Sequence, residues 1–198
     1  MNSHSYKHQA WNALKRRWKI PIFATIIYVW IHTLIFGINM AMRVFNITWL
    51  FTGLINIAYA YVMCDVIRLK PLKLYNAFTT FRRHNVNAFM VGILTYMFQL
   101  LWSILLIVPG IIKTYEYSMV YYVALDKPTI SPLDIIHESS IMMKGKKWEL
   151  FKLDISFFGW YLLSFLTGGI LLFMVIPYHQ AARAAFYEDI RYKPYVTC

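Results

Sequence analysis

Charged side chains are scarce in this sequence, and acidic ones are the scarcest. Asp, Glu, Lys and Arg make up only 15% of the 198 residues, whereas 59% are apolar. A typical soluble domain has about 25% charged and roughly 45–50% apolar residues. This composition excludes an ordinary soluble domain and favours a membrane protein. It also offers a membrane explanation for the net charge of +11, because basic residues gather in cytoplasmic loops. We therefore expect no nucleic-acid partner.

Cysteine and the common catalytic motifs are also missing or nearly so. The two cysteines, Cys64 and Cys198, form no CxxC pair, which argues against a zinc site or a disulfide framework. The chain has no GxGxxG, P-loop, HExxH or GxSxG motif, the patterns that would indicate nucleotide binding or hydrolysis. We therefore predict a protein that is not an enzyme and that has no cofactor, no metal and no catalytic residue.

Long apolar runs, in contrast, are abundant. A helix that crosses a bilayer needs about 20 mostly apolar residues, and we interpret six runs as transmembrane helices of an all-α protein. The fourth and fifth are short for that purpose and need polar flanks or a thinner bilayer. The six runs are Ile20 to Ala41, Trp49 to Val66, Val86 to Val108, Ile111 to Leu125, Ile155 to Thr167 and Ile170 to Phe186.

The distribution of basic residues predicts the orientation. If the N-terminus is inside, 18 of the 20 Lys and Arg fall in cytoplasmic segments, and only Arg43 and Lys113 fall outside. Cytoplasmic enrichment of this kind is the usual sign of topology. We expect a multi-pass protein of the bacterial cytoplasmic membrane with both termini in the cytoplasm.

An internal repeat organises the six runs into three units of one domain, at about residues 5–66, 71–126 and 132–189. Residues 16–23 match 82–89 at an offset of 66, and residues 61–65 match 122–126 at an offset of 61. Each unit has a basic amphipathic helix, a span in, an outer turn and a span out. Pro109-Gly110 and Gly168-Gly169 suit the turns of units two and three.

The amphipathic segments are expected to lie along the inner membrane surface with Lys and Arg toward anionic head groups. They serve either as simple topological anchors or as lipid- or peptide-binding elements. Their apolar faces are Tyr6, Ala10, Leu14 and Trp18; Leu74, Phe78 and Phe81; and Leu133, Ile136 and Met143.

Ionisable residues inside the spans are the candidate functional residues, because each is costly in lipid and needs a partner. Asp154 and Arg183 are equally far from the Gly168-Gly169 turn, which predicts an ion pair that is either structural or involved in gating. Lys113 and Glu116 are spaced to pair on one helix face. His32 either pairs with Glu116, titrates near neutral pH or fills a packing position, and His179 offers an interhelical hydrogen bond.

The second half of the chain resembles a known family. The matching motifs are Trp102-Ser103, Ile107 to Lys113, Tyr117 to Met119, Met142 to Gly145 with Lys147-Trp148, Phe158 to Trp160, Pro177-Tyr178 and Phe186 to Glu188. This pattern, over about residues 99 to 190, resembles an uncharacterised family of bacterial integral membrane proteins, domain of unknown function 975. The resemblance implies a polytopic membrane protein and supplies no activity. A weaker likeness to the membrane domain of some glycerophosphodiester phosphodiesterases hints at lipid or amphiphile handling.

Two functions remain open at this point. The first is a non-enzymatic accessory or immunity factor, which helps export an amphiphilic antimicrobial peptide or protects the membrane against it. The second is a transporter or scramblase-like protein for lipids or other amphiphiles, with the intramembrane charges lining a path between repeat units. The expected partners are membrane lipids with anionic head groups, and further candidates are an amphiphilic peptide and an ABC transporter.

Overall fold

The computed structural model describes residues 3–15, 17–42, 48–70, 85–105 and 107–191. Within these ranges the chain forms helices, turns and irregular segments without strands, which confirms the all-α class. The helices are α1 (Ser3–Leu14), α2 (Lys19–Met42), α3 (Thr48–Ile67), α5 (Asn85–Leu105), α6 (Ile107–Glu116), α7 (Val120–Asp126), α8 (Pro132–Met142), α9 (Lys147–Ile155), α10 (Phe158–Leu166) and α11 (Leu172–Arg191).

The six apolar runs have different outcomes. The first three form the long helices α2, α3 and α5, and the sixth forms α11. The fourth run is divided into α6 and α7 by a turn at residues 117–119, and the fifth yields only the nine-residue helix α10. In the described part of the chain, Lys19–Ile38 is the one segment that is long and apolar enough to cross a membrane, while Ile55–Ile67 and Phe89–Trp102 are shorter apolar stretches.

The two predicted turns also differ. Gly168 and Gly169 have φ values of 66° and 87°, a left-handed conformation that glycine adopts at little cost, so the turn between α10 and α11 is confirmed. The turn predicted at Pro109-Gly110 is wrong, because both residues lie in the first turn of α6. The chain reverses just before, between α5 and α6, and these two helices pack together. Proline fits an early helical position, where its missing N–H is not needed.

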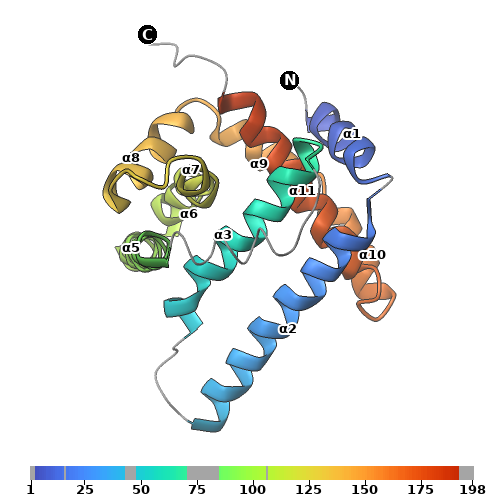
Figure 1. Ribbon diagram of the computed structural model, residues 1–198, viewed down its shortest axis with the longest axis horizontal. Coiled ribbons are helices and arrows are strands. Elements are labelled where there is room, and N and C mark those ends of the chain that lie inside the picture. Colours follow the sequence, from blue (N-terminus) through green and yellow to red (C-terminus); the bar gives the residue numbers. More distant parts are fainter. Residues whose placement is uncertain (1–2, 16, 43–47, 71–84, 106, 192–198) are drawn as a thin grey trace.

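Helices α3 and α5 meet at a pair of glycines. A Cβ atom on Gly92 would lie 2.4 Å from the Cα atom of Gly53, closer than real Cβ contacts. Figure 1 shows α3 lying across the view and α5 nearly end-on, so the two helices cross steeply at this contact. The missing side chains allow the two backbones to touch.

The amphipathic helices bury their apolar faces against protein, which corrects the expectation that these faces enter lipid. On α1, Tyr6, Ala10 and Leu14 are buried, and this helix packs along α11 (Figure 1). On the third segment Ile136 and Met143 are buried, whereas Leu133 is 56% exposed. The second segment, with Leu74, Phe78 and Phe81, lies outside the described residues.

Most buried side chains belong to a packed region, which we define as α1, the C-terminal half of α3, α7, α8 and α9 with the residues that flank them, and the C-terminal half of α11. Figure 1 shows α11 between α1 on one side and α7 and α8 on the other, while α2 extends away from them. Large side chains of this region are completely enclosed, among them Tyr6, Leu14, Ile135, Met143, Leu150, Leu153, Phe157, Phe186 and Tyr187. The packed region therefore resembles the interior of a soluble domain.

Candidate functional site: polar networks between the helices

The predicted pair of Asp154 and Arg183 is confirmed, and His179 joins it. The Arg183 guanidinium donates from Nε to Asp154 Oδ1 at 2.9 Å and from Nη2 to Oδ2. His179 places Nε2 at 2.8 Å from Asp154 Oδ1 and Nδ1 at 2.9 Å from the Tyr161 hydroxyl. A continuous polar chain thus connects α10, α11 and α9.

The ionic contacts in this polar network keep the Asp154 carboxyl charged. Burial by itself raises the pKa of the Asp154 carboxyl, but the hydrogen bonds from His179 and Arg183 outweigh it, and the pKa falls below its ordinary value. The side chains are mostly covered, with 14% of Asp154 and 28% of Arg183 exposed. The arrangement can lock three helices together or relay a proton.

The second predicted pair, Lys113 and Glu116, is confirmed at 2.6 Å. Glu116 also accepts a hydrogen bond from Lys147, at the beginning of α9. The carbonyl oxygen of Glu116 accepts a further bond from the Ser139 hydroxyl of α8 at 2.7 Å. Lys113 lies over the Trp102 ring, 5.2 Å from its centroid. Glu116 therefore fastens the end of α6 to α8 and α9, directly before the turn that separates α6 from α7.

This contact corrects the predicted topology. Lys113 was assigned to the outer side of the membrane and Lys147 to the cytoplasmic side, about one bilayer apart. In the structure both ammonium groups bind the single carboxylate of Glu116, so they lie at the same level. The prediction failed because it placed Lys113 beside an outer turn at Pro109-Gly110 that does not exist.

His32 does not form its predicted pair. Its ring packs on Tyr28 with centroids 4.6 Å apart, and its Nε2 atom is buried without a hydrogen-bond partner among the described residues. Glu116 is instead neutralised by two lysines. His32 therefore packs as expected for a hydrogen-bonded packing residue, the third interpretation, but its Nε2 atom lacks the expected hydrogen bond within the described part of the chain.

A larger ionic network was missed at the ends of three helices. Arg68, directly after α3, donates to Glu188 of α11 at 2.7 Å and to both carboxylate oxygens of Asp126 in α7, at 3.0 and 2.9 Å. Arg191 approaches the same Asp126 carboxylate at 2.9 Å, and the Tyr187 hydroxyl donates to it at 2.7 Å. The three outgoing helices of the repeat units are thus joined at one end.

The sequence did contain a signal for this network. An acidic residue is followed three positions later by arginine at the ends of units one and three, as Asp65 with Arg68 and Glu188 with Arg191. The repeat comparison aligns Asp65 with Asp126. Their shared location was therefore available from the repeat, but the arginines were counted only as topology signals.

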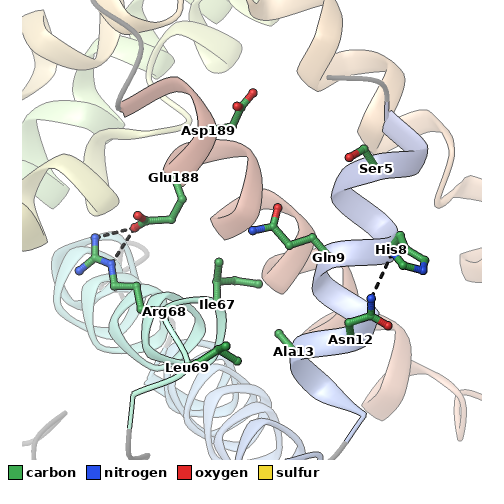
Figure 2. A pocket seen from close by; sticks show the side chains of 10 residues that line it. All are labelled: Ser5, His8, Gln9, Asn12, Ala13, Ile67, Arg68, Leu69, Glu188 and Asp189. Carbon is green, nitrogen blue, oxygen red and sulfur yellow. Dashed lines mark hydrogen bonds and ion pairs between the residues drawn. The ribbon is translucent and has the colours of Figure 1, made fainter.

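Beside this network lies a cleft of about 910 Å³ between α1 and the ends of α3 and α11. Figure 2 shows Gln9 reaching from α1 toward the side that carries Arg68 and Glu188, while Asn12 contacts His8 of the same helix. The cleft's carboxylates already have partners, since Glu188 accepts from Arg68 and Asp189 accepts from Tyr6 at 2.8 Å. Over the residues described, no group of three or more His, Cys, Asp or Glu side chains could hold a metal ion. The other lining residues are Ser5, His8, Ala13, Ile67 and Leu69.

These features define an all-α protein with two kinds of helix. Some helices are joined by ion pairs, and others expose much of their apolar surface. The family model described as "Protein of unknown function (DUF975)" matches residues 103–193. This match confirms the resemblance to domain of unknown function 975 over that part of the chain. No curated protein and no solved structure matches the chain.

Proposed function

We propose that this protein is a non-enzymatic component of the bacterial cytoplasmic membrane, with cytoplasmic termini and three apolar helix pairs embedded in lipid. The pairs are α2–α3, α5–α6 and α10–α11, which correspond to the six predicted spans. Its role is to protect the membrane against an amphiphilic antimicrobial peptide or to assist the export of that peptide. An ABC transporter is the partner class that would supply energy for export.

The exposed apolar surface is the observation that carries this proposal. Only 17% of the apolar window of α2 is buried, and Trp30 and Phe36 are 66% and 60% exposed. On α10, Phe165 is 81% exposed. Soluble proteins rarely expose contiguous apolar patches of such extent. Lipid covers such a surface without cost, because acyl chains are as apolar as the side chains.

The cleft beside α1 supports a role with amphiphilic ligands. Ser5, Gln9 and Asn12 offer hydroxyl and amide groups, while Ile67 and Leu69 offer apolar contact. Binding sites commonly combine apolar lining with a few polar groups that fix orientation. A peptide segment with both kinds of group fits this lining, and a purely ionic ligand does not, because the cleft's charges are already paired.

The direct test is the sensitivity of a deletion strain to a panel of membrane-active peptides, measured with its lipid composition. We expect a lower inhibitory concentration for at least one peptide and restoration by the intact protein. Gln9→Trp, which fills the cleft, should fail to restore resistance. His4→Trp, also on the exposed side of α1 but outside the cleft, should restore it. Equal resistance of deletion and parent strains to every peptide would contradict the proposal.

A transporter or scramblase-like protein for lipids is the second candidate, and one observation favours it. The α6–α7 helix is interrupted next to Glu116, and the α9–α10 helix is interrupted next to Asp154. Transporters commonly bind ions and substrates at such interruptions. Liposomes containing the purified protein should then move a labelled lipid between leaflets, and Glu116→Gln should slow the movement. Rates equal to protein-free liposomes would exclude this alternative.

A further inference from the structure

Two of the three apolar helix pairs contain one short helix, α6 with ten residues and α10 with nine. The α5–α6 hairpin, at residues 96–112, exposes Met97, Leu101, Val108 and Ile111, between 53% and 67% each. The α10–α11 hairpin, at residues 158–175, exposes Phe158, Phe165, Leu166 and Ile170, between 67% and 81% each. Both hairpins thus present apolar side chains that no described part of the protein covers.

A polar contact marks the base of each hairpin. In the first it is Glu116 with its two lysines, and in the second it is Asp154 with His179 and Arg183. Ile107 precedes Glu116 by nine residues, about 14 Å of helix, and Gly169 precedes His179 by ten, about 15 Å. The hydrocarbon core of a bilayer is about 30 Å thick. Each hairpin therefore reaches about half of that depth.

The surface next to these bases has the character of a lipid head-group zone. Trp148 on α9 is 63% exposed, and Lys152 lies over its ring at 5.8 Å. Lys146 and Lys147 at the start of the same helix bind Glu149 and Glu116, and each keeps about a third of its side chain exposed. Tryptophan concentrates at membrane interfaces, and lysine is attracted to the anionic inner leaflet. The base is thus suited to contact anionic head groups while the hairpins point into the hydrocarbon.

We propose that the α5–α6 and α10–α11 hairpins insert into the cytoplasmic leaflet only, and that acyl chains of that leaflet cover them. This inference rests on the proposed membrane location. Helix α2 differs, because its 24 residues extend about 36 Å and suffice to cross. The α2–α3 pair then anchors the protein across the bilayer, and the other two pairs insert into the cytoplasmic leaflet.

Exposure around α10 favours lipid over a second protein chain as the cover. At 100° per residue, its exposed residues Phe158, Trp160, Leu162, Leu163, Phe165 and Leu166 spread over about 220° of the helix circumference. The remaining side, with Tyr161 and Ser164, faces the rest of the protein. A partner helix would cover one side of α10 and leave the others in water. Fluid acyl chains cover all of them.

Spin-label depth measurements test this inference in vesicles of phosphatidylethanolamine and phosphatidylglycerol. The labels go on Val108→Cys and Phe165→Cys, one per hairpin, with Ile111→Cys and Leu166→Cys as the respective replacements if a variant misfolds. Cys198 is changed to Ser, and Cys64 is fully buried. Trp30→Cys and Ile38→Cys on α2 provide internal references, since they lie about 16 and 28 Å from Lys19 along the helix. Collision rates with oxygen and with a water-soluble nickel chelate give each depth.

We expect the labels at 108 and 165 to match the midplane depth of the label at 30, with high oxygen and low chelate collision. A depth equal to that of the label at 38 would show that a hairpin crosses the bilayer completely. Reaction of a cysteine at Gly168 with an impermeant reagent outside cells would show the same. Either result would overturn the inference but leave the membrane location intact. Low collision rates with both oxygen and the nickel chelate would show that protein covers the label, and would overturn the inference as well. Free chelate collision at all four positions would refute the membrane location itself.

Discussion

Helices α9 and α10 follow each other in the chain, but their apolar side chains differ in how far they are buried. Leu150, Leu153 and the nearby Phe157 are completely buried, whereas Phe165 and Leu166 are 81% and 75% exposed. The difference lies in the pattern rather than in the residue type. The buried residues Leu150 and Leu153 share one face of α9, whose other positions include Lys, Glu and Asp, while Tyr161 and Ser164 are the polar side chains of an otherwise apolar α10. A one-sided pattern predicts packing on protein, and an all-round pattern predicts burial in lipid or core.

The ion pair below α10 should give the largest effect on stability. Asp154→Ala leaves Arg183 buried without its partner, and a loss of about 3–5 kcal/mol is typical for a well-buried pair. Thermal unfolding in detergent measures it. Because the pair is in contact, the double change Asp154→Ala with Arg183→Ala should cost less than the sum of the two single changes. Strict additivity would show that the two side chains do not interact.

The same truncation in the two regions sharpens the comparison directly. Leu150→Ala opens a cavity in the packed region and should cost about 2–5 kcal/mol. Leu166→Ala removes an exposed side chain and should change the free energy of unfolding by less than about 0.5 kcal/mol. Both values come from the same unfolding measurement in detergent. Similar losses for the two variants would mean that α10 is packed against protein in the folded state.

The crossing of α3 and α5 predicts a smaller but specific loss. Gly92→Ala places a methyl group 2.4 Å from the Gly53 Cα atom, so the helices must separate, at a cost of about 1–3 kcal/mol. Gly159→Ala in α10 is the matched control, because nothing lies within 4 Å of its added Cβ. Alanine there should be neutral or stabilising by about 0.5–1 kcal/mol. A Gly92→Ala protein as stable as the parent would argue against the close crossing.

An exposed ion pair of the packed region should give the smallest effect. Lys127 binds Glu138 at 2.7 Å with half of its side chain exposed. Solvent screening limits such pairs to about 0–1 kcal/mol, so Lys127→Ala should lower the melting temperature only slightly, and added salt should reduce the difference further. A loss comparable to that of Asp154→Ala would mean that burial is not what separates the two pairs.

The sequence by itself determined the helical class, the positions of the long helices and two ion pairs. Apolar runs of about 20 residues became α2, α3 and α5 almost without change, because local hydrophobicity and helix propensity agree there. Asp154 with Arg183 and Lys113 with Glu116 were found from spacing alone, since helix geometry fixes which residues share a level or a face. The Gly168-Gly169 turn was found because only glycine adopts its backbone conformation easily.

Only the tertiary structure decided which surfaces meet. Lys147 reaches Glu116 across a sequence separation of 31 residues, and Arg68 reaches Glu188 across 120; spacing within one helix has no information about such contacts. The same reason explains the wrong side assignment of Lys113 and the burial of α1 against protein rather than lipid. An apolar helix face indicates only that this face is shielded from water. Whether protein or lipid excludes it depends on helices far away in the chain, and their positions follow from packing the whole molecule.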